Sequence, residues 1–278
     1  MNASPSDGPA IVLQDVHIGF EEREVLRGVS FSVAPNETLA LLGETGSGKT
    51  LLLKIVAGLL RPDSGRVQVL GREITGMSEN ELLEFRHQMG FVFQEGALFD
   101  SMSVAENVAY RLREAAVEEP EIESRVMETL RFVEMQDALE KLPGELSGGM
   151  RRRVSIARAL VSHPPIVLYD SPTAGLDPVT SQTIITLILR LRDLYGVTAL
   201  LATQRLQDAF ALSNFRFVRE TNSVVRLPPD GLQASVFPDG TARPLTRFLF
   251  LREGKVYFEG GQEEVMSSKD DYLRRFLV

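Results

Sequence analysis

The 278-residue sequence contains no cysteine and three histidines, His17, His87 and His163, which are scattered along the chain. Without cysteine, the chain can form neither disulfide bonds nor thiolate metal sites. Three scattered histidines also argue against a zinc site.

Long apolar runs are also missing, since none approaches the roughly 18 to 20 residues that a membrane-spanning helix needs. Residues 1–9 lack the positive start and the apolar centre of a secretion signal, and we expect a short disordered lead there. We therefore expect a soluble, cytoplasmic protein, or one that docks on a membrane through a partner.

The overall composition is that of a globular protein, with 44% hydrophobic and 24% charged residues. The length allows a full core in one large domain or two small ones. Lys and Arg total 30 against 38 Asp and Glu, which gives a net charge of −8. This acidic balance argues against a general nucleic-acid surface, although it leaves room for a local basic patch.

The segment 43–50 fits the phosphate-loop pattern G-x-x-x-x-G-K-[ST]. Thr38–Leu42 before it has the length of a buried strand, and Leu51–Gly58 after it is typical of a helix that ends at a glycine. Strand, turn and helix N-terminus together aim backbone N–H groups at one point, where a phosphate binds. Lys49 would reach the outer phosphates and the Thr50 hydroxyl would hold magnesium. The predicted loop residues are Gly43, Glu44, Thr45, Gly46, Ser47, Gly48, Lys49 and Thr50.

Ahead of the loop, from Ala10 to Leu42, the sequence predicts three short strands, interrupted by the polar turn Glu21–Glu24. Phe20 is the aromatic residue of this region. It could stack on an adenine ring or simply cap a small sheet, and for an aromatic residue the core role is the more frequent one.

Beyond the first helix, Ser78 with Glu81, and Ser103 with Glu106, form capping-box patterns that predict two helix starts. Between them, Gly90–Gln94 is typical of a strand that ends in a polar side chain. From Ser103 to Leu142 the periodicity is helical, so a helical block interrupts an α/β chain.

A second helix start of interest lies at Ser147, Gly148 and Gly149. Its first turn carries no acidic residue, which makes it a second phosphate-binding helix N-terminus by the same physics. The three arginines at 151–153 could form a nucleic-acid patch. We favour a solvated face with interface contacts, because they lie on one helix of an acidic protein.

Asp170 ends the apolar strand Pro165–Asp170 and is the expected second magnesium ligand in a chain with a phosphate loop. Helix 179–195 and strand 197–203 follow, and the strand ends at Gln204. In the tail, turn signals at 228–231 and 238–240 suggest a small extra hairpin or a mobile loop at about 219–247. A hairpin at 248–260 and short helices at 263–266 and 271–277 close the chain.

Together these segments resemble the nucleotide-binding subunits of ABC transporters, from about Ile11 to Leu277. Gln94 is similar to the family's Q-loop glutamine, which touches magnesium and the transmembrane partner. Residues 146–150 resemble the LSGGQ signature, with Met150 in the last place. Asp170 resembles the Walker B aspartate and 174–177 the D-loop, while Phe20 takes the place of the adenine-stacking aromatic residue.

Within that family, the amino-acid sequences of segments 93–104, 150–153 and 172–178 resemble those of Mla-type ATPases, which energise phospholipid transport with MCE-domain lipid carriers. The resemblance implies an α/β P-loop NTPase fold with a RecA-like core, a small antiparallel β subdomain and an inserted helical subdomain at about 95–160. Residues 10–278 would form a single nucleotide-binding domain.

The resemblance also implies partners. Two copies would stand head to tail with ATP and Mg2+ between them, each phosphate loop facing the other copy's Ser147, Gly148 and Gly149. The helical subdomain would touch a transmembrane permease and so hold the protein on the inner face of the cytoplasmic membrane. Thr50, Gln94 and Asp170 would ligate magnesium.

Two positions depart from the family pattern. Ser171 stands where the family has the glutamate base, and Gln204 where it has a histidine that contacts the γ-phosphate. Serine is not a base at neutral pH, and general-base catalysis contributes roughly 10² to 10⁴ in rate. Glutamine can bond a phosphate but carries no charge. We expect binding to survive and hydrolysis to slow, unless positioning and charge stabilisation suffice. The implied catalytic set is Lys49, Gln94, Asp170, Ser171 and Gln204.

Two other functions compete with a homodimeric transport ATPase. The chain could be the degenerate, regulatory half of a heterodimer, whose intact Ser147, Gly148 and Gly149 complete a competent site on a second ATPase. It could instead be a soluble ABC protein of repair or translation. Such proteins carry two cassettes or a long coiled-coil insertion, and a 278-residue chain with one set of motifs has room for neither.

Overall fold

A computed structural model describes residues 8–21, 23–227, 235–236, 242–243 and 246–277. The expected disordered lead lies almost wholly outside these residues. Both turn signals of the expected extra hairpin or loop at 219–247 lie outside them too.

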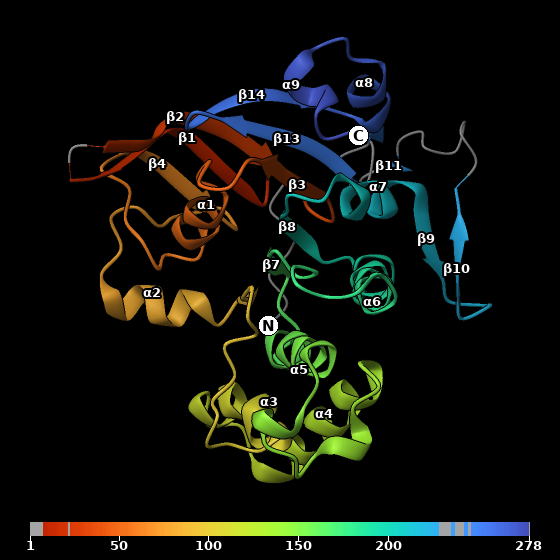
Figure 1. Cartoon of the computed structure of the whole chain (residues 1–278). Helices are drawn as coiled ribbons and strands as arrows, with labels where there is room; N and C mark the ends of the chain where they lie inside the picture. Colours follow the sequence, from red (N-terminus) through yellow and green to blue (C-terminus); the bar gives the residue numbers. More distant parts are fainter. Residues whose placement is uncertain (1–7, 22, 228–234, 237–241, 244–245, 278) are drawn as a thin grey trace.

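A six-stranded sheet runs through the centre of the molecule (Figure 1). Five strands are parallel, and β14 is antiparallel at one edge. Strands β3, β7 and β8 are buried along their whole length, which explains their nearly unbroken apolar sequences. The order across the sheet is β14 (Lys255–Gly260), β13 (Thr246–Arg252), β3 (Thr38–Gly43), β8 (Thr198–Ala202), β7 (Ile166–Asp170) and β6 (Met89–Val92).

Alternate residues of this sheet face different hydrophobic cores, as the two-residue period of a strand requires. In β3, Leu39 and Leu41 pack with α1 (Lys49–Val56) and with a second sheet. Ala40 and Leu42 face the opposite way and pack with three other helices. These are α7 (Leu206–Asn214), α8 (Gln262–Ser267) and α9 (Asp271–Arg274).

The second sheet is antiparallel and matches the β subdomain that the family resemblance implies. Its order is β2 (Arg23–Val33), β1 (Ile11–Phe20), β4 (Ser64–Val69) and β5 (Arg72–Glu73). The predicted three strands between Ala10 and Leu42 are present as β1, β2 and β3, but β1 and β2 are longer than predicted and each is continuous. The polar residues that break the apolar pattern in β1 form a bulge between Leu13 and Val16, with Asp15 at φ 50°, and the strand continues beyond it.

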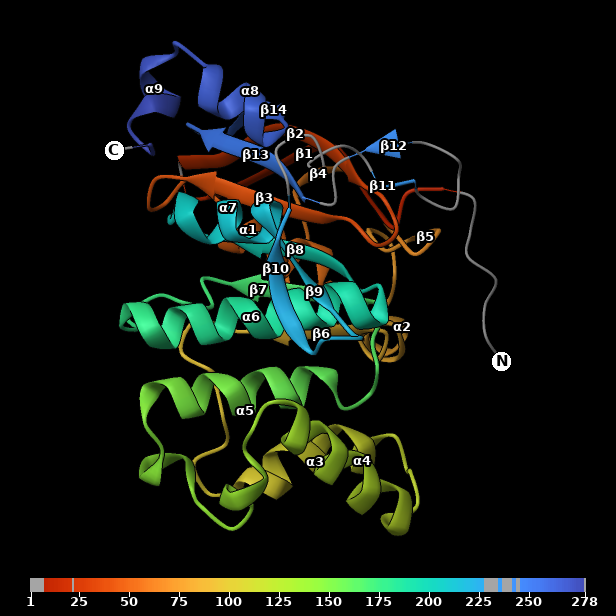
Figure 2. The same ribbon diagram turned by 90° about the vertical axis from the view of Figure 1, so that its right-hand side faces the viewer.

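The predicted helical block follows β6. Figure 2 shows α6 lying between the central sheet and α5, with α3 and α4 beyond α5. Both capping boxes are confirmed: at Ser103, the backbone N–H donates to Glu106 Oε2 at 2.7 Å while Oγ accepts from Glu106 N at 3.2 Å. The helices are α2 (Glu79–Arg86), α3 (Val104–Glu114), α4 (Glu119–Phe132), α5 (Gly148–Leu160) and α6 (Pro178–Tyr195), with short 3-10 turns at Gln136–Ala138 and Pro143–Glu145.

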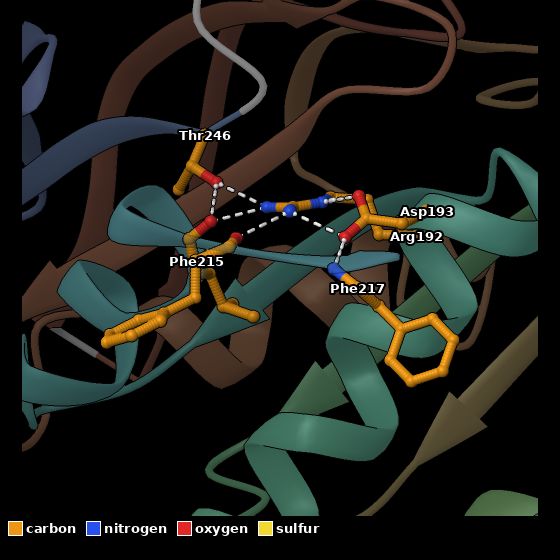
Figure 3. A network of polar contacts seen from close by, with 6 residues as sticks. Arg192, Asp193, Phe215, Phe217 and Thr246 are labelled. Carbon is orange, nitrogen blue, oxygen red and sulfur yellow. Dashed lines mark hydrogen bonds and ion pairs between the residues drawn. The ribbon is translucent and has the colours of Figure 1, made fainter. Parts of the chain in front are cut away.

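A hairpin that the sequence did not predict, β9 (Phe215–Val218) with β10 (Ser223–Arg226), lies beside α6 (Figures 1 and 2). A buried ion pair anchors it (Figure 3): Arg192 Nε lies 2.7 Å from Asp193 Oδ1, and Asp193 Oδ2 accepts from Phe217 N at 2.6 Å. Arg192 also donates to the Phe215 carbonyl at 2.9 Å and to Thr246 Oγ1 at 3.3 Å. One pair therefore joins α6, β9 and β13. A further two-residue pairing joins β11 (Ser235–Val236) to β12 (Ala242–Arg243).

Candidate functional site: a phosphate loop at the carboxyl edge of the sheet

The phosphate loop connects β3 to α1, as predicted, and two of its glycines are required by close neighbours. A Cβ on Gly48, at φ 103°, would lie 2.4 Å from Leu26 Cδ2 of β2. A Cβ on Gly43, at φ 146°, would lie 2.5 Å from the Leu251 carbonyl oxygen of β13. Glycine is needed here for both conformation and space. The loop is thus held between the β subdomain and the last parallel strand.

The Lys49 side chain folds into this loop. Its Nζ donates to the carbonyl oxygens of Gly43 and Glu44, both at 2.8 Å, and to Ser47 Oγ at 3.3 Å. Burial lowers the pKa of Lys49 to about 8, and the nearby Asp170 carboxylate opposes that shift. An ammonium group is therefore placed inside the cradle where the backbone N–H groups of a phosphate loop converge.

Thr50 and Asp170 come together from α1 and β7. Thr50 Oγ1 donates to Asp170 Oδ1 at 3.1 Å. Burial raises the pKa of the Asp170 carboxyl, while the Thr50 hydrogen bond and the Lys49 charge oppose that rise. Hydroxyl and carboxylate oxygens are ligands that Mg2+ accepts, so this pair fits a magnesium ion that also binds substrate phosphates.

Ser171 and Gln204 follow β7 and β8, two neighbouring strands that end at the same edge of the sheet. The Ser171 N–H donates to the Ala202 carbonyl at 2.8 Å, and Ser171 takes the left-handed conformation at φ 46°. Thr45 Oγ1 donates to Gln204 Oε1 at 3.3 Å, which ties Gln204 to the phosphate loop. The structure therefore brings both departures to the edge where ligands bind in open α/β sheets.

Gln94 lies two residues beyond β6, the edge strand beside β7. Arginines of α5 hold the segment around it. Arg152 Nη1 donates to the Phe93 carbonyl at 2.6 Å, and Arg158 donates to the carbonyls of Gly96 and Ala97 at 3.0 and 2.8 Å. Among the described residues, no hydrogen bond joins Gln94 to the Lys49, Thr50 and Asp170 group.

The prediction of a solvated arginine face was wrong. Arg152 is 6% exposed, and its Nη2 atom lies 3.5 Å from the Ala174 carbonyl oxygen. Arg151 donates to the Leu146 carbonyl at 2.8 Å, and Arg153 to the Glu134 carbonyl at 3.4 Å. These side chains tie loops to α5. A charge run shows only that a helix carries arginines; tertiary contacts decide that backbone carbonyls cover them.

Ser147 caps α5, and its Oγ accepts from Met150 N at 3.2 Å. A Cβ on Gly149 would lie 2.4 Å from Thr180 Cγ2, so this helix start packs against the beginning of α6. In the part of the chain that the structure describes, no hydrogen bond links residues 147–149 to the phosphate loop. Within one chain, the two predicted phosphate-binding helix starts thus have no direct polar link.

Phe20 ends β1 with 47% of its surface exposed. The core role that its residue type favoured was therefore wrong, and the ring is available for stacking. No helix among the described residues is both long and apolar enough to cross a membrane.

The geometry agrees with comparisons to known proteins. The ABC transporter family model matches residues 26–174. Protein TRIGALACTOSYLDIACYLGLYCEROL 3 of Arabidopsis thaliana is 34% identical over 96% of this chain and 73% of its own length. MlaF of Escherichia coli, an intermembrane phospholipid transport system ATP-binding protein, is 34% identical over 77% of this chain and 80% of its own. A methionine import ATP-binding protein, MetN of Brucella abortus, is 38% identical over 72% of this chain but about half (54%) of its own length.

Among solved structures, the dimeric ATP-binding cassette MJ0796 bound to ADP and Pi superposes with a TM-score of 0.72 at 27% identity, over 90% of this chain and 98% of its own. The resemblance in motifs, the P-loop fold and the relatives lead to one conclusion. The chain belongs to the ABC transporter family, as an ATP-binding subunit whose ATPase activity is coupled to transport.

Proposed function

We propose that this chain binds ATP and Mg2+ and powers or gates an ABC transporter that moves phospholipids with an MCE-type system. The cluster of Lys49, Thr50 and Asp170 carries the nucleotide part of this proposal. The likeness to MlaF supports the cargo. A permease would hold the protein on the inner face of the cytoplasmic membrane.

In this proposal Lys49 contacts the outer phosphates, and Thr50, Gln94 and Asp170 hold the metal. Mg2+ would neutralise charge on the phosphate oxygens as the terminal phosphate leaves. Phe20 stacks on the adenine, and the partner copy's signature helix closes the site from the other side. ATP is then bound between two copies of the chain.

Cleavage is the weak step of this site. The Ser171 hydroxyl cannot take a proton from water at neutral pH, and Gln204 can donate to a phosphate without adding charge. Loss of a general base lowers the rate by roughly 10² to 10⁴, whereas the positioning groups around Lys49 are retained. We therefore propose tight nucleotide binding with slow turnover.

A groove beside α2, β6 and α3 supports a permease partner. Its volume is about 370 Å³, and its aromatic lining includes Phe91, Phe93 and Tyr110. Its rim carries three exposed apolar side chains, Leu59 at 46%, Leu83 at 57% and Phe99 at 40%. Clustered exposed apolar side chains of this kind mark interaction sites. Because Ala97 and Arg158 line the groove and Arg158 also donates to the Gly96 carbonyl, a segment bound there would contact the loop that carries Gln94.

A second candidate function is the regulatory half of a heterodimer. It is favoured by the replacement of both catalytic positions in a chain whose Ser147, Gly148 and Gly149 are intact. Such a chain would bind ATP in its own weak site and complete a competent site on the other subunit.

Co-purification of the tagged chain from its native membrane separates these functions. The proposal expects two copies of this chain with a permease and an MCE-domain protein, and ATP binding that Lys49→Ala abolishes. A second ATPase in equal amount would support the heterodimer instead. Absence of any permease, or ATP binding unchanged by Lys49→Ala, would contradict the transport proposal.

A further inference from the structure

The end of the described chain packs against β13, the strand that pairs with β3 just ahead of the phosphate loop. Helices α8 and α9 lie over β13 and β14 in both views (Figures 1 and 2). Within α9, Tyr272 is 5% exposed, and its hydroxyl donates to the Leu251 carbonyl at 2.8 Å in a buried hydrogen bond. A buried phenol that donates to a backbone carbonyl is a fixed contact, because breaking the hydrogen bond leaves two buried polar groups without a partner.

The same Leu251 carbonyl oxygen also lies close to Gly43 of the phosphate loop. Leu251 and Gly43 are partners in the parallel pairing of β13 with β3, and a Cβ on Gly43 would lie 2.5 Å from the Leu251 oxygen. On its other side, the peptide of Gly43 accepts from Lys49 Nζ at 2.8 Å, as does Glu44. Burial raises the pKa of the Tyr272 phenol, so its hydroxyl stays protonated and donates to Leu251.

Tyr272 is held in place by its own surroundings. Arg252 lies over the rings of Tyr257 and Tyr272, at 5.2 and 5.1 Å from their centroids, and the Phe276 ring lies 5.4 Å from that of Tyr272. Asp270 caps α9 by accepting from Tyr272 N and Leu273 N at 2.9 and 3.0 Å. The hydroxyl is therefore pre-oriented toward Leu251 rather than free to rotate away.

We infer that Tyr272 is a positioning residue of the nucleotide site: through the Leu251 carbonyl it fixes Gly43 and Glu44, the entry of the phosphate loop. The segment after β14 is thus part of the ATP site, although it touches no phosphate. This inference rests on the proposal that the loop binds ATP. A loop that is already ordered loses less freedom on binding, so the contact strengthens ATP affinity.

The test compares two variants that each remove one phenolic hydroxyl from the same aromatic cluster. Tyr272→Phe deletes the bond to Leu251. Tyr257→Phe deletes an exposed bond of 2.6 Å to Asp270 Oδ2, whereas the cap of α9 accepts on Asp270 Oδ1 and is retained, so this variant is the matched control. Titration calorimetry of the full chain with ATP and Mg2+ gives both Kd and stoichiometry, and thermal unfolding is recorded alongside.

We expect Tyr272→Phe to raise Kd for ATP roughly three- to tenfold with stoichiometry unchanged, the range that one buried hydrogen bond provides. Tyr257→Phe should leave Kd as in the wild type. A merely structural role would reduce the folded fraction, so stoichiometry would fall while Kd stayed constant. That result, or equal Kd values for Tyr272→Phe and Tyr257→Phe, overturns the inference.

If Tyr272→Phe does not fold, Asp270→Ala provides the second test, because it removes the cap of α9 and keeps the phenol. The inference then predicts a raised Kd at full stoichiometry, and an unchanged Kd overturns it. A wild-type chain that fails to bind ATP would instead contradict the proposed function, so the two failures are distinguishable.

Discussion

At the scale of single residues, the contact between Thr45 and Gln204 joins the phosphate loop to one of the two positions that depart from the family pattern. Thr45 Oγ1 donates to Gln204 Oε1 at 3.3 Å, which leaves the amide N–H groups of Gln204 for a phosphate oxygen. Thr45→Val keeps the shape and removes the hydroxyl. We predict about a two- to fivefold loss in the preference for ATP over ADP, the size of a partly exposed hydrogen bond. Competition binding measures it.

Thr45→Ser is the control for this prediction, because it retains the hydroxyl and should keep the wild-type preference. If Thr45→Val and Thr45→Ser discriminate equally well, the Thr45 contact does not orient Gln204.

His17 gives a pH dependence of stability. Its ring nitrogens lie 2.8 Å from Glu24 Oε1 and 3.2 Å from Asp15 Oδ1, and these hydrogen bonds raise the pKa of His17 above 6.5, with Glu24 the larger cause. Arg27 Nε lies 3.9 Å from Glu24 Oε2 and is a further charged group beside the His17 and Glu24 pair. A raised pKa means that the stabilisation is complete below pH 6.5 and is lost as pH rises through the folded-state pKa.

Urea unfolding across that pH window tests the point. The wild type should lose free energy of unfolding relative to His17→Gln as pH rises above 6.5. Parallel pH profiles for the two proteins would contradict the assignment.

That Lys49, Thr50 and Asp170 lie together could be predicted from sequence, because a phosphate loop fixes their local order and parallel strands end at a common edge. The roles of Arg152 and Arg158 could not. Whether an arginine faces water or a carbonyl depends on loops that are distant in sequence, such as those of Phe93 and Ala174.

At the scale of secondary-structure elements, the Arg192 and Asp193 pair joins α6 to β9 and β13 (Figure 3). Arg192→Ala would leave the largely buried Asp193, with an 11% exposed side chain, without its ionic partner and would remove a donor from the Phe215 carbonyl. Breaking a buried pair in this way costs about 3–5 kcal/mol of unfolding free energy. Chemical denaturation should show a loss of that size.

Arg66→Ala is the matched control, since it breaks the 3.4 Å pair with Glu73, whose side chains are 65% and 53% exposed. We expect it to cost less than about 1 kcal/mol. Equal losses in the two variants would show that the Arg192 pair is no more than a surface contact.

Which elements were predictable follows from how local their signals are. The helices at Ser78 and Ser103 carry capping boxes within four residues and were predicted. Helix α7 has no side-chain hydrogen bond at its N-cap, and β9 is anchored by α6 through contacts that span more than twenty residues. No local pattern reports such anchoring, so both were missed.

At the scale of the whole molecule, the groove beside α2 and α3 lies at the edge of the central sheet that β6 forms. Leu83→Asp would place a charge on its rim, where Leu83 is 57% exposed. We predict at least about a tenfold loss in permease co-purification with ATP affinity unchanged, because burying an unpaired charge opposes docking. Met266→Asp, at a residue 58% exposed and outside this groove, is the control and should co-purify normally. Equal recovery of permease with both variants would place the docking site elsewhere.

ATP binding and ATP cleavage draw on different residues of this molecule. In the proposed function, binding depends on groups that the structure gathers around Lys49, and slow cleavage would follow from Ser171 and Gln204 at the ends of β7 and β8. These two properties can be measured on the same preparation.

The most direct test is therefore ATP turnover of the assembled complex with the wild-type chain and with Ser171→Glu, alongside their ATP affinities. The account predicts equal affinities, slow wild-type turnover and an increase of about 10²-fold or more in Ser171→Glu, the contribution of a general base. Wild-type turnover as fast as that of Ser171→Glu would contradict it.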